Sequence, residues 1–527
     1  MRSRLVLSGS VRRSIASPPW TDWVRALRRG MPYALCLGLA LVVQTSPSDP
    51  VILIQPYLQP GHEAALRTED SKTLRWYTDL KPAAFAVRFG EEGATPRIAL
   101  PERSRIQWPG FDAFQYTASL EDLPLNAVIR YRVVQEPRGP STNVLTVREG
   151  SFATRRSPDR AVRFFVAGDL ADGKPTSRRI ADQIARVKPE FGLLTGDIVY
   201  SNGTLTEYLD HFWPVYNQPA STGPQYGAPL MKSVVFYPVV GNHDLSGFDF
   251  HRYPDGMAAF LFFDVPRNGP RFLPQHFLAA DAATWKIHVE KSVLRGFPPI
   301  QGPTGRLADF RESVGTMFPG LCNYSFENGP LHALCLDMSG YVNVDDPTLN
   351  DWIRADLLSS SAPWKLVFFH QPGFNQSKSH WAEQRARRLA PLFESCGVAM
   401  VFSGHVHNYQ RSHPLRFKPS QIQTNGEVPG TFQLDNRFDG RRRTRADGVI
   451  YIVSGGAGAS LYDKDFTGHP KAWKRGASEP ENYMARFVSD RHTFSLLDVG
   501  PDRLTLRQID DRGAEVDHLE VTRGASP

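Results

Sequence analysis

Cysteine is scarce in this sequence of 527 residues, which contains Cys36, Cys322, Cys335 and Cys396. So few cysteines exclude a disulfide framework as the basis of the fold. Residues 324–326 and 331–336 are typical of two hairpin strands around a turn at 327–330. A turn centred on Asn328 and Gly329 would place Cys322 opposite Cys335, within disulfide range. Pro330 leaves this register open, so a disulfide and two free apolar cysteines remain equal alternatives.

Long apolar runs are also missing. The run Met31–Val43 has 13 residues, whereas a membrane-spanning helix needs about 20. Its length suits the apolar core of a secretory signal, and Ser46-Pro47-Ser48 offers small residues for cleavage. We therefore predict that residues 1–48 are a signal peptide or leader, and that the mature protein is exported (periplasmic or secreted) without a membrane span. The long basic stretch before the run leaves two alternatives, an uncleaved membrane anchor and twin-arginine export.

The mature chain has little excess charge of either sign. The formal net charge is +7, but the leader contains seven Arg and one Asp and carries +6 of it. About +1 is left for the remaining residues, so the basic composition gives no argument for a nucleic-acid partner. Apolar, charged and aromatic contents of 41%, 22% and 11% are ordinary for a globular protein and exclude disorder, collagen and coiled coil as the main class.

The first part of the mature chain, residues 51–156, is typical of an all-β domain. Short runs of alternating, β-branched and aromatic residues are separated by turn residues. Examples are residues 73–78, 83–89, 114–120 and 128–134. The pattern predicts a small antiparallel sandwich, and this region has no cluster of acid, base or metal-ligand residues.

From residue 161 onward the pattern changes to an α/β domain. Continuous apolar runs indicate strands that are covered on both faces. These runs are residues 164–167, 192–195, 234–240, 366–369, 398–402 and 449–453. Between them, residues 177–187 and 382–392 have helical composition. We therefore predict a layered α/β fold over residues 161–460, followed by a β-rich extension over residues 461–527.

Polar side chains follow the ends of the predicted strands, where ligands collect in open α/β sheets. They are Asp169, Asp197, Asn242, His243, Asp244, His370, His405 and His407. Each one alone has an ordinary structural explanation, but oxygen and imidazole donors at one sheet edge suit cations such as Zn, Fe and Mn. The donors are too many for one four-coordinate ion. They suit two ions about 3.5–4 Å apart that share a carboxylate, as in phosphoryl displacement.

These residues carry a resemblance to a known family. The motifs are Gly168-Asp169, Gly196-Asp197-x-x-Tyr200, Gly241-Asn242-His243-Asp244, His370-x-Pro372 and Gly404-His405-x-His407. Together they resemble the five motifs of calcineurin-like metallophosphoesterases, and Tyr200 resembles the purple acid phosphatase branch. The resemblance covers about residues 51–460, and it implies a metallophosphoesterase β-sandwich flanked by helices. It also implies that residues 51–156 form a fibronectin type III-like domain.

The resemblance also implies roles for the site residues. Asp169, Tyr200 and His407 would bind one ion, Fe(III) by analogy with the family. Asn242, His370 and His405 would bind a second ion, which would be Zn, Fe or Mn, and Asp197 would bridge the two. A phenolate and carboxylates suit a trivalent hard cation, and imidazoles and an amide suit a softer divalent one. The implied reaction is hydrolysis of phosphomonoesters by a metal-bridging hydroxide, of acid phosphatase type.

Three further residues are candidates for catalysis. His243, held beside Asp244, could contact the phosphate or protonate the leaving oxygen. His380, ten residues after His370, matches a position where the family has a histidine near the metals, and we expect substrate binding or acid catalysis there. The alternative is an exposed loop histidine.

Several features leave the substrate open. Ala171, Asp244 and Gln410 depart from the residues usual in the family, which puts the pH optimum and metal preference in doubt. The insertion at residues 246–321 could roof the site or be an inert surface segment. We expect a small phosphate ester as the partner. The alternatives are a phosphodiesterase or nucleotide-pyrophosphate hydrolase and, in another class, an inactive phosphate- or glycan-binding module. The oligomeric state stays open.

Overall fold

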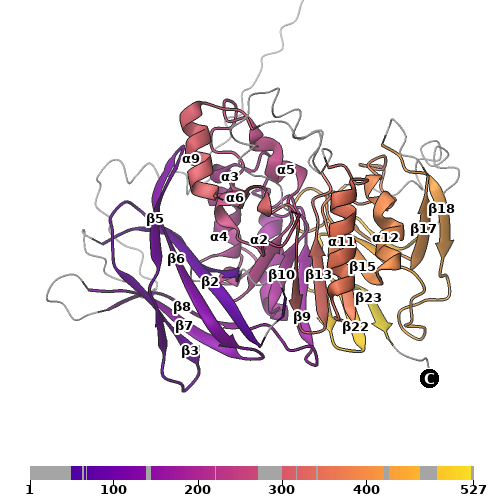
Figure 1. Ribbon diagram of the computed structural model, residues 1–527, viewed down its shortest axis with the longest axis horizontal. Coiled ribbons are helices and arrows are strands. Elements are labelled where there is room, and N and C mark those ends of the chain that lie inside the picture. The colour runs from indigo at the N-terminus through magenta and orange to yellow at the C-terminus, as the bar shows by residue number, and fades with distance from the viewer. Residues whose placement is uncertain are drawn as a thin grey trace, which may run out of the picture. The chain divides into compact units, whose positions relative to one another are not determined.

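The structure is a computed structural model that describes residues 49–61, 65–66, 68–137, 144–219, 221–270, 300–315, 317–339, 342–420, 426–462 and 483–523. The predicted leader, residues 1–48, lies outside the described residues. None of the helices in the described ranges is long and apolar enough to cross a membrane. Figure 1 shows the helices and strands.

An all-β domain comes first in the chain. It has two antiparallel four-stranded sheets, with the strand orders β1-β2-β6-β5 and β4-β3-β7-β8. The strands are β1 (Ile52–Pro60), β2 (Glu69–Thr78), β3 (Phe85–Glu91), β4 (Arg97–Ala99), β5 (Glu102–Trp108), β6 (Phe111–Pro124), β7 (Val128–Gln135) and β8 (Leu145–Ala153). In their shared core, Trp76 stacks on Tyr116 with ring centroids 5.4 Å apart, and Phe85 packs edge-on against Tyr116 at 4.7 Å. The predicted all-β domain is confirmed, and its fibronectin type III-like character stays a prediction.

The following α/β part contains a six-stranded sheet, β11-β10-β9-β21-β22-β23, and a seven-stranded sheet, β12-β13-β14-β15-β19-β16-β20. The strands are β9 (Val162–Ala167), β10 (Phe191–Leu194), β11 (Val235–Pro238), β12 (Tyr324–Asn328), β13 (Leu331–Cys335), β14 (Trp364–Phe368), β15 (Val398–Ser403), β16 (Tyr409–Ser412), β19 (Ile450–Ser454), β20 (Met484–Val488), β21 (Thr493–Val499), β22 (Arg503–Asp510) and β23 (Glu515–Thr522). A separate hairpin is formed by β17 (Leu415–Pro419) and β18 (Gly430–Leu434). Strands β9 to β11 are parallel in the first sheet, and β13, β14, β15 and β19 are parallel in the second.

Strand β14 shows how the layers pack. Leu366 lies in the same apolar core as Phe164 of β9. The next residue, Val367, lies in a second core with Ile353 of α11 and Phe393 of α12. Because β14 is buried on both faces, its sequence is a continuous apolar run rather than an alternating one. Figure 1 shows α11 and α12 beside this sheet. The predicted layered sandwich with flanking helices is confirmed.

The helical elements are mostly short. They are α2 (Pro175–Val187), α3 (Leu205–Glu207), η1 (Tyr208–Phe212), α4 (Trp213–Tyr216), η2 (Leu230–Lys232), α5 (Asn242–Leu245), η3 (Ser246–Phe248), α6 (Ala259–Phe262), α9 (Thr304–Val314), α10 (Met317–Gly320), α11 (Pro347–Ser359), η4 (Arg385–Leu389) and α12 (Ala390–Ser395). The helix predicted over 382–392 is wrong in its bounds, because a 3₁₀ segment precedes an α-helix that starts at Ala390. Pro391 lies in the first turn of α12, where its missing N–H costs no helical hydrogen bond.

The cysteine alternative is settled by the register of one hairpin. Asn328 pairs with Leu331, so the turn is Gly329-Pro330 rather than one centred on Asn328-Gly329. Gly329 has φ +59°. Two-residue turns that match the twist of the flanking strands need a positive φ at this first position. Cys335 therefore lies opposite Tyr324 and not Cys322, and no disulfide joins these two buried cysteines. The predicted register was wrong, and the disulfide alternative is excluded.

The insertion at residues 246–321 is described except for residues 271–299 and 316. Its described part is not an exposed appendage, because Phe260 and Phe262 are at most 1% exposed. The Tyr57 hydroxyl of the all-β domain donates to the backbone oxygen of Phe262 at 2.8 Å. The Ala258 backbone N–H donates to the Gly203 oxygen at 2.9 Å, which ties the insertion to the loop after Tyr200. This part is therefore packed into the protein and is not a surface segment, while its role, including a roof over the site, stays a prediction.

Candidate metal centre

The predicted ligand residues lie where parallel strands of both sheets end. Asp169 follows β9, Asp197 follows β10, and Asn242 begins α5 shortly after β11. In the other sheet, His370 follows β14 and His405 follows β15. Residues at the carboxyl ends of parallel strands share one edge of a sheet, which is why side chains distant in sequence meet here.

The first cluster gathers around the phenol of Tyr200. Its hydroxyl lies 2.8 Å from Asp169 Oδ1, 3.1 Å from Asp197 Oδ2 and 3.1 Å from His407 Nε2. His407 Nε2 also lies 3.3 Å from Asp169 Oδ1. Asp169, Tyr200 and His407 are thus within contact of one another, as the proposed first metal site requires.

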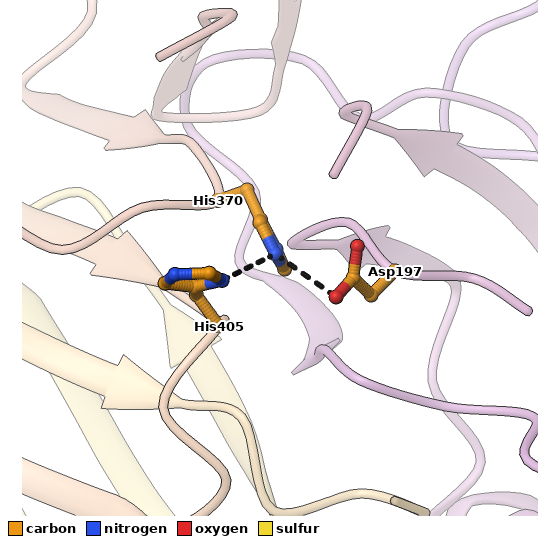
Figure 2. Close-up of side chains that lie close together, drawn as sticks. All are labelled: Asp197, His370 and His405. Atoms are coloured by element: carbon orange, nitrogen blue, oxygen red, sulfur yellow. Dashed lines mark hydrogen bonds and ion pairs between the residues drawn. The ribbon is translucent and has the colours of Figure 1, made fainter. Parts of the chain in front are cut away.

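The second cluster gathers around His370. Its Nε2 lies 3.1 Å from Asn242 Oδ1, 3.2 Å from His405 Nδ1 and 3.2 Å from Asp197 Oδ2. Figure 2 shows His370 between His405 and Asp197, with both contacts dashed. Asp197 therefore contacts both clusters, which is the position expected of a bridging carboxylate.

The backbone at these strand ends is held in an uncommon conformation. Asp169, Asp197 and His405 have φ values of +59°, +50° and +67°. Non-glycine residues rarely adopt this region, and when they do they cluster at functional sites. The backbone at Gly241 also lies very close to Asp197, because a Cβ added to Gly241 would lie 2.2 Å from Asp197 Oδ1. Glycine is needed there for space.

The three histidines share one hydrogen-bonding arrangement. Nδ1 of His370 donates to the Thr195 backbone oxygen at 2.7 Å, and Nδ1 of His407 donates to the Ser460 oxygen at 2.8 Å. Nε2 of His405 donates to Glu383 Oε2 at 2.9 Å. Each ring thereby directs its other nitrogen toward the carboxylates or the neighbouring imidazole. A histidine that binds a metal is usually fixed in this way, by an acceptor on its outer nitrogen.

This donor set suits cations. In the neutral tautomers just described, His370 Nε2 and His405 Nδ1 face each other with lone pairs, and the oxygens of Asn242 and Asp197 face the same point. Acceptors without a positive charge between them repel one another, so a metal ion, or a proton on His370, is needed there. The residues present therefore fit the two metal ions of the predicted centre.

The pKa shifts follow from burial and from these contacts. Burial acts to lower the pKa of His370, but the charge and hydrogen bond of Asp197 raise it to about 10. The pKa of Asp197 is lowered, because burial raises it less than His370 and the other imidazoles lower it. Burial, together with the charges of Asp169 and Asp197, raises the pKa of the Tyr200 phenol well above its usual value. Deprotonation of this phenol therefore calls for a cation beside it.

His243 lies at the edge of the first cluster and is half-buried. Its backbone N–H donates to Asp197 Oδ1 at 2.8 Å, and its ring Nδ1 donates to the Ser201 oxygen at 2.6 Å. The ring centroid lies 4.5 Å from that of Tyr200. Nε2 lies 3.9 Å from Asp197 Oδ2, close enough to the site for the predicted role toward a substrate.

Asp244 has different contacts from those expected. One carboxylate oxygen accepts from the Gly241 N–H at 2.9 Å and the other from the Ile198 N–H at 3.0 Å. Burial and the charge of Asp197 raise its pKa to about 7. The expectation that Asp244 orients the His243 imidazole is corrected by these contacts, which hold the turn that presents Asn242. Sequence adjacency is misleading here, because successive helical residues do not share a face.

The structure brings His380 to the site. Its ring centroid lies 3.9 Å from that of His405, and its Nδ1 donates to Glu383 Oε1 at 2.7 Å. Its Nε2 lies 3.4 Å from the Tyr462 hydroxyl. His380 has φ +56°, so the loop itself is held in an uncommon conformation.

Sequence reasoning missed two residues of this site. Glu383 contacts both His380 and His405, and its one available signal was its position three residues after His380. Tyr462 stacks on His407, with ring centroids 4.0 Å apart and an interplanar angle of 9°. Burial, with nearby carboxylates, raises the pKa of Tyr462 to about 12. No pattern in the sequence points to this tyrosine.

Comparison with known proteins agrees with this geometry. Residues 162–409 match the calcineurin-like phosphoesterase family model. The chain is 26% identical over 257 residues to purple acid phosphatase 18 of Arabidopsis thaliana, covering 48% of this chain and 45% of that one. It is 33% identical over 271 residues to purple acid phosphatase 21 of the same plant, covering 50% and 48%. The matches span about half the length of these relatives.

A solved structure of a purple acid phosphatase from yellow lupin (Lupinus luteus) seeds has the same fold. The TM-score is 0.59 at 16% sequence identity, and the match covers 89% of this chain and 74% of that one. At this identity the likeness concerns the fold alone. The family model and the matched relatives lead to one conclusion: residues 162–409 form a calcineurin-like phosphoesterase domain, in a chain that is similar to purple acid phosphatases.

Proposed function

We propose that this protein hydrolyses phosphomonoesters at a binuclear metal centre. One observation carries the proposal: two ligand clusters share the Asp197 carboxylate, and each of the three histidines has its outer nitrogen hydrogen-bonded. Such a site is built to hold two cations close together, the arrangement used for phosphoryl transfer.

We assign Asp169, Tyr200 and His407 to one ion, and Asn242, His370 and His405 to the other. The first set combines a phenol with carboxylates and suits Fe(III), and the second suits Zn, Fe or Mn. When bound, the cation pair would activate water and neutralise charge on the phosphoryl oxygens.

Substrate contact and proton transfer are assigned to protein side chains. His243 and His380 lie beside the two clusters, with rings that can donate a hydrogen bond to a phosphoryl oxygen. In protonated form either one can transfer a proton to the leaving oxygen, which a monoester with a poor leaving group requires. The substrate class is thus a small phosphate ester. Export of the protein is proposed from the leader sequence.

The experiment measures hydrolysis of a chromogenic phosphomonoester and its diester from pH 4 to 9, on protein purified without chelator. Metal content is determined on the same sample. We expect two metal equivalents, preference for the monoester and an acidic optimum. Preference for the diester or an optimum above neutrality would replace the proposal with a phosphodiesterase or nucleotide-pyrophosphate hydrolase. Two bound metals without turnover would support a binding module.

A further inference from the structure

Glu383 contacts both a proposed metal ligand, His405, and a proposed proton donor, His380. Its Oε2 accepts from His405 Nε2 at 2.9 Å, and its Oε1 accepts from His380 Nδ1 at 2.7 Å. The two imidazole rings pack on each other, with centroids 3.9 Å apart. Both oxygens of the carboxylate are therefore used on imidazole N–H groups.

The loop that carries Glu383 is anchored on both sides of it. The Glu383 backbone N–H donates to the His380 oxygen at 3.1 Å. The next residue, Gln384, is 2% exposed, and its side chain bonds to Trp381 and Val428. The Glu383 side chain itself is half-exposed, so its direction is set by the two imidazoles and not by burial.

The contact with His405 decides which nitrogen of that ring can bind a metal. With Nε2–H donated to Glu383, the lone pair lies on Nδ1. That nitrogen is 3.2 Å from His370 Nε2, inside the second cluster. Without the carboxylate, the proton is free to move to Nδ1 and block the ligand nitrogen. Acceptors of this kind raise metal affinity by fixing the ring and its tautomer.

The contact with His380 acts on the same principle. Nδ1–H is held by Glu383, which leaves Nε2 pointing toward the Tyr462 hydroxyl 3.4 Å away. The two histidine contacts lower the pKa of Glu383 by more than burial raises it, so the side chain is an anion that can accept from both rings.

We propose that Glu383 is a positioning residue that orients His405 for metal binding and His380 for the substrate, and so couples the second metal site to proton donation. The part concerning His380 rests on the proposed function, whereas the part concerning His405 does not. A competing arrangement is possible with the same atoms, because His380, Glu383 and His405 have ligand atoms close enough to hold a cation themselves. Metal stoichiometry separates the two.

The test compares wild type, Glu383→Gln and a matched control, Glu102→Gln on the exposed face of β5. Glutamine keeps the size of the side chain, but its amide nitrogen cannot accept from a second imidazole. Metal retention is measured against graded chelator, with Tm recorded for each variant. We expect Glu383→Gln to hold one metal as wild type does and to lose the other at about 10–100-fold lower chelator concentration, with Tm close to that of the control.

Two outcomes would overturn the proposal while wild type still binds two metals. One is wild-type retention of both metals in Glu383→Gln. The other is a third metal equivalent in wild type that Glu383→Gln lacks, because Glu383 would then be a ligand. The pH profile of activity gives a second readout. If Glu383 positions His380, Glu383→Gln changes the basic limb of this profile when His380 is present. The same substitution has no effect on the basic limb when it is added to His380→Ala. Failure of wild type to bind two metals would instead refute the proposed function.

Discussion

Asp197 contacts both ligand clusters, through Tyr200 on one side and His370 on the other. Its Oδ1 additionally accepts from the His243 backbone N–H, so the side chain cannot rotate freely. The carboxylate is 1% exposed and its pKa is lowered by the imidazoles around it. Because its side chain has so many fixed contacts, Asp197 is the residue whose substitution we expect to disturb the site most.

We therefore expect Asp197→Asn to remove metal from the centre and to reduce kcat/KM by at least about a thousandfold. The neutral amide has one acceptor oxygen and cannot bridge two cations, and loss of several kcal/mol of charge stabilisation corresponds to a factor of this order. Metal analysis and steady-state kinetics check it, with the exposed Asp112→Asn as control. Two tightly bound metals in Asp197→Asn would contradict the bridging assignment.

His243 offers a separate test, because it lies beside the clusters without belonging to either. We expect His243→Ala to keep both metals and to lower kcat about 10²–10⁴-fold, the usual contribution of a proton donor. A matched control is His518→Ala, which removes a half-buried histidine that bonds to Glu515 on β23. If His243→Ala loses a metal, His243 is a ligand and the assignment fails.

At the scale of elements, the turn between β11 and α5 determines whether Asn242 and Asp197 can meet. Gly241 lies against Asp197, and Asp244 closes the turn by accepting from the Gly241 N–H. We expect Gly241→Ala to push Asp197 aside and to weaken metal binding by about tenfold or more, with the protein still folded.

The matched control is Gly305→Ala in the first turn of α9, where an added Cβ meets no atom within 4 Å. Alanine is the better helix former, so this variant should be neutral or slightly more stable. Metal content and circular dichroism are measured for both. Equal metal binding in the two variants would show that the close approach at Gly241 is unimportant.

A second element-level prediction concerns the hairpin β12–β13 and helix α11. His332 on β13 lies 2.8 Å from Asp356 of α11 and 3.7 Å from Glu327 of β12. Burial acts to lower its pKa, but the two carboxylates raise it above the usual value. A raised pKa in the folded state means that the stabilisation is complete below about pH 6.5 and is lost as the pH rises through the folded pKa.

We accordingly expect His332→Asn to lower Tm by a few degrees at pH 6, and the difference from wild type to shrink by pH 9. The part that remains at pH 9 reflects lost packing and not charge. Thermal unfolding at the two pH values measures both parts. A difference that is constant, or that grows with pH, would show that His332 is not held as a cation.

At the scale of the whole molecule, the all-β domain and the α/β part share an apolar core with the insertion. Arg306 of α9 lies where the insertion meets the all-β domain. Its guanidinium carbon is 4.1 Å from the ring centroid of Trp108 in the all-β domain and 4.2 Å from that of Phe250 in the insertion. Cation–π contacts in a desolvated setting contribute about 2 kcal/mol or more.

We expect Arg306→Ala to lower Tm and to speed proteolytic cleavage between the all-β domain and the α/β part. The value of kcat/KM for the phosphomonoester should be unchanged, because Arg306 has no contact with the proposed ligands. Exposed Arg437→Ala is the control. An unchanged Tm and proteolysis rate would mean that this arginine does not join the parts, and loss of activity would mean that the insertion reaches the site.

The sequence by itself determined the strands, the fold class and the candidate ligands, because these depend on short-range signals. Continuous apolar runs mark strands buried on both faces, and the residue after such a run must lie at a sheet edge. Order and spacing of Asp169, Asp197, Asn242, His370 and His405 were therefore enough to predict a metal site.

The tertiary structure alone decided the register of the Gly329-Pro330 turn, the contacts of Asp244 and the roles open to Glu383 and Tyr462. Each depends on which groups meet across loops, and a difference of one residue in a turn changes every pair in the hairpin. Side-chain direction decides the rest: Asp244 follows His243 in the chain but points to the backbone of the turn, whereas Glu383 reaches His405, 22 residues away.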